Sequence, residues 1–369
     1  MAARRLSIKD LATQLNVSAS TVSRALAGLP NVSQATQQRV RELAGTLNFQ
    51  PNSLAAGLRR GSTGVIGVIV PRLTGHFFPE VLHSIAAAAS QAGLRVIICE
   101  SNEDEQQEQA QLLWLLTVQV DGLLISVANA AGSTRHFDVT RQQGVPLVFF
   151  NQAIDCWRAS SVVFNNCQGA YKGVGHLIAQ GRTRVALFTG AQHHAVSREQ
   201  RRGYAEALQE HGLFLDERLV CAGGPTLAAG RQHMLALLAG PVVPNAIFAT
   251  QELVAIGAMQ VLKEHGLRIP QDVALAAFTT ESLAALAEPA LTSLDQQGSA
   301  MGQAAVQLLL KLLADTKQVI ASQCLVLNPT LLVRASSVGA VAGCGTPARP
   351  RAKPSAPAGR HKEVARMLA

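Results

Sequence analysis

The chain has 369 residues, 48% of them hydrophobic, and a net charge of +8. This is enough apolar material for two or three globular units. The apolar runs, such as 63–71 and 145–150, fall short of the roughly 18 residues that a membrane span needs, and the first residues show no apolar core of a secretory signal. The composition therefore argues against membrane and secreted classes and predicts a cytoplasmic protein.

The positive charge is concentrated at the two ends of the chain. Residues 1–60 carry a net +6 and residues 340–369 a net +5, whereas residues 61–339 carry a net −3. Phosphate contacts need a local density of Lys and Arg, so a basic head on a mildly acidic body favours a nucleic-acid partner. A solvated charged surface without a partner is the alternative.

The first 50 residues predict three short helices with clear start signals. Ser7 is suited to cap a helix that begins at Ile8, and Ser18 a second helix over residues 19–26. Ser33 is suited to cap a third helix that extends to about Leu47. This spacing fits a helix-turn-helix and equally an unspecialised three-helix bundle. The outward face of the second helix favours the helix-turn-helix, because it is small, polar and ends in Arg24, as entry into a major groove requires.

Residues 51–61 predict a short helical linker. After residue 63 the residue pattern changes. The linker is too short to be stable alone and is expected to fold only on a partner. Short β-branched runs then alternate with amphipathic helices, which predicts parallel sheets covered on both faces. Strands are expected at 65–70, 95–99, 122–126, 146–150, 185–189, 246–249 and 273–276. This many strands favours two doubly wound lobes, and the Ala, Pro, Gly and Arg-rich residues 339–369 predict a disordered basic tail.

Several stretches resemble the LacI/GalR (lactose repressor) family of bacterial transcription regulators, over about residues 6–337. The most specific are Ile8-Lys-Asp-Leu-Ala12, Val17-Ser-Ala-Ser-Thr-Val-Ser-Arg-Ala-Leu26, Asn48-Phe-Gln-Pro-Asn52, Ile66-Gly-Val-Ile-Val-Pro71, Val120-Asp-Gly-Leu-Leu124, Arg202-Gly-Tyr204 and Ala255-Ile-Gly257. They fall in the family's order and spacing, which makes coincidence implausible.

The resemblance implies the domain organisation. It gives an N-terminal all-α helix-turn-helix domain (1–50), a hinge helix (51–61) and an α/β periplasmic-binding-protein-like core of two doubly wound parallel-sheet lobes (62–338). The chain would cross between the lobes three times, with lobe 1 at about 62–160 and 290–322 and lobe 2 at about 161–289 and 323–338. The family also implies a homodimer, and the tail lacks the leucine heptads that would join dimers into a tetramer.

The same resemblance implies the contacts with a double-stranded DNA operator. Ala19 and Ser20 would face base edges, and Arg24 a guanine edge or a phosphate. The remaining contacts from the head and linker would be Ser18, Thr21, Ser23, Asn31, Ser33 and Asn52. Ala55 and Leu58 would enter the minor groove, Leu58 as an apolar wedge, although an ordinary inward-facing linker residue is the alternative for Leu58. A two-fold dimer predicts a pseudo-palindromic operator.

The family also implies a small-molecule effector between the lobes. The expected contacts are Phe77, Phe78, Asn151, Arg198, Gln200, Gln251, Thr279 and Gln296. Where sugar-binding members usually carry charged clamps, this sequence has Asn151, Gln200, Gln251-Glu252 and Ala277-Phe278-Thr279-Thr280, and Pro225 replaces an aromatic residue. Arg198, Arg201, His193 and His194 are expected on one loop and would be substitutes, although an ordinary solvent-exposed loop residue is the alternative for each. A cleft so poor in charge predicts a neutral or weakly polar effector, sugar-like or otherwise, or a loss of effector control.

The sequence also argues against two other functions. An enzyme is not expected, because the sequence has no Gly-x-Ser-x-Gly elbow, no Walker A loop and no Gly-x-Gly-x-x-Gly that opens a helix. Its six cysteines form no pair or cluster at metal-ligand spacing, so no cofactor, metal or catalytic residue is assigned. A transport solute-binding protein would need a secretory signal and no basic head. Repression by operator occupancy at the nucleoid is the default mechanism, and activation stays the alternative.

Overall fold

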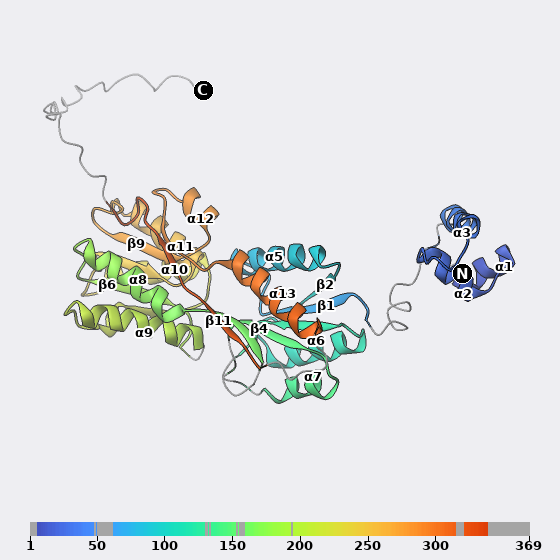
Figure 1. The fold of residues 1–369 in the computed structure, drawn as a ribbon. Helices are drawn as coiled ribbons and strands as arrows, with labels where there is room; N and C mark the ends of the chain where they lie inside the picture. Colours follow the sequence, from blue (N-terminus) through green and yellow to red (C-terminus); the bar gives the residue numbers. More distant parts are fainter. Residues whose placement is uncertain are drawn as a thin grey trace, which may run out of the picture.

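The computed structural model describes residues 6–47, 49, 62–129, 132, 134–152, 154, 159–192, 195–314 and 321–338. Within these ranges the chain forms a small all-α head and an α/β core of two lobes (Figure 1), as the sequence predicts. The predicted hinge helix 51–61 and the predicted tail 339–369 lie outside the described residues, as do His193 and His194.

The head consists of helices α1 (Ile8–Leu15), α2 (Ala19–Leu26) and α3 (Gln34–Thr46). Each begins at its predicted cap, since the hydroxyls of Ser7, Ser18 and Ser33 accept hydrogen bonds from the backbone N–H groups three residues on. The three helices close around a cluster whose fully buried members are Leu11, Val22, Ala25 and Val40. The head therefore has a core of its own.

Lobe 1 contains a six-stranded parallel sheet in the order β11-β5-β4-β3-β1-β2. Its strands are β1 (Val65–Val70), β2 (Arg95–Glu100), β3 (Gly122–Ile125), β4 (Leu147–Asn151), β5 (Ser160–Phe164) and β11 (Cys324–Leu327). Its helices are α5 (Phe77–Gln91), α6 (Glu105–Thr117), η1 (Arg135–Phe137), α7 (Asp138–Gln142) and α13 (Gly298–Ala314).

Lobe 2 contains a second six-stranded sheet, in the order β12-β10-β9-β8-β6-β7. Its strands are β6 (Val185–Thr189), β7 (Val220–Ala222), β8 (Ala246–Ala249), β9 (Ala274–Phe278), β10 (Thr292–Asp295) and β12 (Thr330–Leu332). Its helices are α8 (Asn166–Ala179), α9 (Ala195–Glu210), η2 (Glu217–Leu219), α10 (Leu227–Ala239), α11 (Glu252–Glu264) and α12 (Glu281–Leu286). All strand pairs are parallel except β10 with β12.

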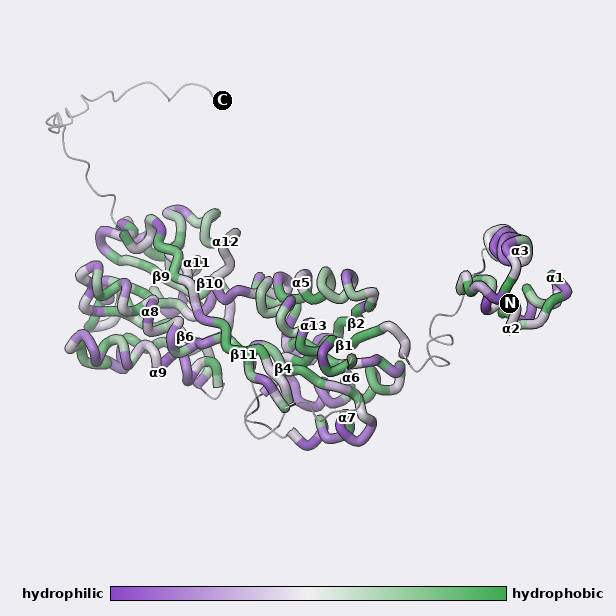
Figure 2. Tube along the Cα trace, viewed as in Figure 1, coloured by the Kyte–Doolittle hydropathy of each residue, from purple (hydrophilic) through white to green (hydrophobic). Residues whose placement is uncertain are grey.

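The central strands of both sheets are buried on both faces, which is why they read as continuous apolar runs. In Figure 2, β1 and β4 are hydrophobic over most of their length. Alternate residues point to opposite faces: Val68 packs in the cluster that contains α5 and α13, and Ile69 in the cluster that contains α6. No helix in the described part of the chain is both long and apolar enough to cross a membrane.

The chain crosses between the lobes three times, as predicted, but each crossing lies at different residues from those predicted. Strand β5 completes the sheet of lobe 1, so the first crossing follows Phe164 and not residue 160. Strand β10 pairs with β9 in lobe 2, so the second crossing lies at 296–297 and not before 290. Strand β11 pairs with β5 in lobe 1, so the third crossing lies at 328–329 and not at 323.

The strands beside the three crossings have weak sequence signals, which is why the predicted crossing points differ from those in the structure. Ser160, Ser161, Thr292 and Ser293 are buried polar residues in β5 and β10, which interrupt the apolar runs that predict a strand. The third crossing has only two residues between β11 and β12, which leaves no turn signal long enough to mark it.

Candidate functional site

Helix α2 is fixed so that one face packs into the head and the other faces outward. Asn16 adopts a left-handed conformation (φ 54°) that ends α1 and turns the chain. The Ser18 hydroxyl accepts a hydrogen bond from the Thr21 N–H at 3.1 Å, and the two hydroxyls lie 2.8 Å apart. Val22 and Ala25 anchor the inner face at 0% exposure. The N-terminus and outer face of α2 are thereby presented at the surface.

The predicted DNA contacts of the head lie at its surface as far as the structure describes them. Arg24 is exposed in the last turn of α2. Ala19 packs partly against the head cluster, so little of it faces outward. The others are Ser18, Ser20, Asn31 and Ser33, which are exposed, and Thr21 and Ser23, which are half-buried. Asn52, Ala55 and Leu58 lie outside the described residues.

The chain enters lobe 1 at a point that Asp121 holds with several hydrogen bonds. Its carboxylate accepts from the Ser62 hydroxyl at 2.7 Å, the Thr63 N–H at 2.7 Å and the Gly64 N–H at 2.8 Å. Burial raises the pKa of Asp121, but these hydrogen bonds outweigh it and hold the pKa below its usual value. The first described residues after the linker are thus tied to the loop between α6 and β3.

A cleft of about 470 Å³ is lined by residues of both lobes. Its walls come from the loops that follow strands β1, β4, β6 and β8 and from the first residues of α5, α9 and α11. Ligands of open α/β sheets bind at this end of the strands. Six of the predicted effector residues line the cleft, namely Phe77, Phe78, Asn151, Gln200, Gln251 and Gln296, whereas Arg198 and Thr279 do not.

The lobe 2 wall of the cleft carries uncharged polar groups that lack partners within the described chain. Thr250 and Gln251 line the cleft, and the Thr250 hydroxyl and the Gln251 side-chain oxygen are buried without a hydrogen-bond partner in the described chain. Such groups cost stability unless something outside the protein satisfies them. The rings of Phe77 and Phe78, packed edge to face at 5.2 Å, add an apolar surface from lobe 1.

The cleft carries more charge than the sequence predicts, although the charges are paired. Arg72 forms a 2.7 Å ion pair with Glu103 inside lobe 1. Glu252 of lobe 2 accepts hydrogen bonds from His76 of lobe 1. The expectation of a cleft poor in charge is therefore wrong in part. The sequence holds one signal for Arg72 and Glu103, because each lies in the loop that follows the carboxyl end of a strand in the parallel sheet.

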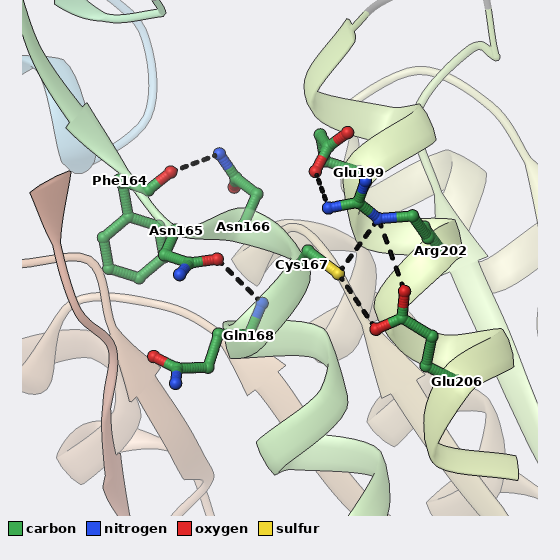
Figure 3. Close-up of polar contacts among 8 residues, drawn as sticks. All are labelled: Phe164, Asn165, Asn166, Cys167, Gln168, Glu199, Arg202 and Glu206. Atoms are coloured by element: carbon green, nitrogen blue, oxygen red, sulfur yellow. Dashed lines mark hydrogen bonds and ion pairs between the residues drawn. The ribbon is translucent and has the colours of Figure 1, made fainter.

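Gln200 connects the cleft to the first crossing segment. Its amide donates to the Asn166 side-chain oxygen at 3.2 Å, and the Asn166 amide donates to the Phe164 carbonyl at 3.2 Å, as Figure 3 shows for the second bond. Asn165 caps α8 by accepting from the Gln168 N–H at 3.0 Å. A group bound at Gln200 thus lies two hydrogen bonds from the point where the chain leaves lobe 1.

Cys167, which follows Asn166 in the sequence, belongs to a polar cluster on α8 and α9 (Figure 3). Its thiol donates to Glu206 at 3.4 Å and accepts from the Arg202 guanidinium at 3.3 Å. Burial raises the pKa of the thiol in spite of Arg202, and the thiol's two hydrogen bonds connect α8 with α9. Among the residues that the structure describes, no three His, Cys, Asp or Glu side chains are placed to hold a metal ion.

Comparisons with known proteins match both parts of the chain. Residues 7–52 match the bacterial regulatory proteins of the lacI family, and residues 174–337 match a periplasmic binding protein-like domain. The HTH-type transcriptional repressor CytR of Escherichia coli (strain K12) is 31% identical over 306 residues, which are 82% of this chain and 88% of that protein.

Solved structures share the same architecture. The lac repressor dimer bound to operator and the anti-inducer ONPF is 25% identical, with a TM-score of 0.80 over 91% of this chain and 100% of its own. The complex of the transcriptional regulator CelR with cellobiose is 27% identical, with a TM-score of 0.68 over 90% of this chain and 100% of its own.

Proposed function

Because this chain belongs to the LacI family of bacterial regulatory proteins, we propose that it is a repressor that binds a pseudo-palindromic operator as a homodimer. A small molecule in the cleft between the lobes controls its affinity for that operator. Its relatives are transcriptional repressors, so the chain is a regulator and not an enzyme.

The observation that carries the proposal is the outer face of α2. It combines small side chains with one exposed guanidinium, and Val22 and Ala25 fix its orientation from the inner face. Small side chains let a helix lie close to the groove floor, and Arg24 supplies a bidentate donor for a guanine edge. Residues 51–61 would then act as the hinge helix on DNA, joined to lobe 1 at the Asp121 anchor.

Apolar side chains at the surface of the core support the homodimer. Ile98 is 44% exposed on β2, the edge strand of the lobe 1 sheet, and Leu286 of α12 is 82% exposed. Contact with a second copy of the chain would remove these side chains from water, which favours association. A dimer would present two α2 helices to the two halves of a palindrome.

The effector is a small, uncharged polar molecule. Thr250 and Gln251 offer hydrogen-bonding groups without a net charge, and Phe77 and Phe78 offer an apolar surface for a ring or carbon skeleton. Binding at Gln200 would reach the first crossing through Asn166 and so bias the angle between the lobes.

Selection of bound DNA from a random pool tests the function directly. We expect an inverted repeat to be enriched, and its affinity to fall steeply with salt. Deletion of residues 1–60 should abolish binding to the selected site. Deletion of residues 340–369, which removes a net +5 against the +6 of the head, is the charge-matched control and should preserve recognition. No enriched repeat, or an equal loss from both deletions, would contradict the proposal.

A further inference from the structure

The two lobes are joined directly across the cleft by Glu252 and His76. Glu252 is the first residue of α11 in lobe 2, and His76 immediately precedes α5 in lobe 1. One carboxylate oxygen of Glu252 accepts from the His76 backbone N–H at 3.0 Å and contacts the His76 ring nitrogen Nδ1 at 2.5 Å. Both residues line the cleft.

The two halves of this contact differ in how firmly they are held. The Glu252 side chain is 13% exposed, and its second oxygen accepts from the buried Thr279 hydroxyl at 3.2 Å. It also lies at the N-terminus of a 13-residue helix, where the helix dipole favours a negative charge. The His76 side chain is 46% exposed. The carboxylate is therefore the fixed half and the imidazole the replaceable half.

The ion pair between Arg72 and Glu103 provides a contrast. Arg72 and Glu103 also line the cleft, at 2.7 Å from each other, but both belong to lobe 1. This pair neutralises Arg72 without joining the lobes. A molecule that enters between the lobes consequently has to supply a new partner for Glu252 if it displaces His76.

We propose that Glu252 and His76 form a latch that holds the lobes together until the effector replaces His76 on the Glu252 carboxylate. The effector then carries a hydrogen-bond donor, hydroxyl or N–H, and no negative charge at the end that faces Glu252, since an anion there would be repelled. The inference rests on the proposed function in one respect, which is that the cleft is the effector site.

Hydrogen–deuterium exchange on the full-length chain tests the latch, with each variant measured on the lobe that it does not alter. His76→Ala should speed exchange at amides 251–255 of lobe 2, and Glu252→Ala at amides 75–79 of lobe 1. We expect an increase of about tenfold or more in each case, as for the loss of one hydrogen bond to a charged group. Glu103→Gln removes the pair that stays within lobe 1 and should leave amides 251–255 unchanged. Unchanged exchange in both latch variants, or an equal increase in Glu103→Gln, would overturn the latch.

Chemical rescue tests the replacement step without knowledge of the effector. Free imidazole should restore slow exchange at amides 251–255 in His76→Ala and should have no effect in Glu252→Ala. Acetate, an anion of similar size, should restore neither. Imidazole that fails to protect His76→Ala, or acetate that protects it equally, would overturn the idea that a small donor takes the place of His76. Failure of the proposed function would appear elsewhere, as an absence of specific DNA binding by the unaltered chain.

Discussion

Gly203 of α9 packs directly against the backbone of Cys167 in α8, where a Cβ atom on Gly203 would lie 2.0 Å from the Cys167 carbonyl oxygen. A backbone atom cannot rotate away as a side chain can, so a methyl group there would force the two helices apart. We predict that Gly203→Ala lowers the free energy of unfolding by about 1–3 kcal/mol, as overpacking does elsewhere. Urea denaturation measures this.

Gly175, in the interior of α8, is the matched control. A Cβ there would meet nothing closer than the Cε1 atom of His211 at 3.9 Å. Gly175→Ala should raise the free energy of unfolding by about 0.4–1 kcal/mol, because alanine restricts the unfolded chain more than glycine does. Equal effects of the two substitutions would show that the close contact between α8 and α9 is not what Gly203 provides.

Arg24 should provide much of the base recognition. We predict that Arg24→Ala weakens binding to the selected operator by about five- to 150-fold, the loss of one bidentate contact with a base. Arg39, exposed on α3, is the control of equal charge. Arg39→Ala should reduce the affinity for every DNA sequence by the same factor, and this factor should be smaller than the loss that Arg24→Ala causes on the operator. Fluorescence anisotropy on operator and scrambled DNA separates the two effects, and identical profiles for both variants would exclude a base contact by Arg24.

Leu58 should act only when the hinge folds on its operator. Truncation to alanine removes the apolar wedge that unstacks the central base step, whereas phosphate contacts remain. We expect Leu58→Ala to weaken operator binding by at least tenfold, on the order of what a mismatched base pair costs, with little change on random DNA. Equal losses on both DNAs, measured at one salt concentration, would refute the wedge.

The uncharged residues Asn151 and Gln200, at positions where sugar-binding members of the family carry charged clamps, predict a selective response to ligands. Ordinary hexoses, pentoses and their phosphates should shift the melting temperature little, whereas an uncharged molecule that satisfies Thr250 and Gln251 should shift it by several degrees near saturation. Gln251→Ala should reduce that shift. A thermal-shift screen in which a sugar phosphate stabilises the protein most strongly would contradict an uncharged effector.

Cys221 should react slowly with alkylating reagents at neutral pH. Burial raises the pKa of its thiol to about 11, so almost none is thiolate at pH 8. We predict that its alkylation rate rises about tenfold per pH unit until the pH approaches that value. The exposed Cys324 is the internal reference and should react fast at pH 8. Peptide mass spectrometry follows both, and equal rates at pH 8 would contradict the burial of Cys221.

The sequence predicts the head most accurately because its signals are local. Ser18 and Thr21 form their capping bond within one turn, and the predicted bounds of α2 agree with the structure. The central strands are also predicted, since a strand such as β1 is a continuous apolar run. Strand β5 was missed because Ser160 and Ser161 are polar and yet buried.

The cleft shows the limit of this approach. The family resemblance predicts that Asn151 and Gln200 lie in the cleft, and both line it. The sequence does not predict the contact between His76 and Glu252, because the two residues are 176 positions apart. The distance between them depends on the orientation of lobe 1 relative to lobe 2. Neither residue has a local pattern that indicates the other.

The three crossings decide the order in which this protein can be completed during synthesis. Strand β11, which pairs with β5 at the edge of the lobe 1 sheet, ends at Leu327, and β12 adds the last strand of lobe 2 only five residues later. Domains generally fold as units as they leave the ribosome. The head is whole once about 50 residues have emerged, but neither lobe has all its strands until some 280 more have followed. A nascent chain would therefore possess its DNA-reading helices long before the part that governs them.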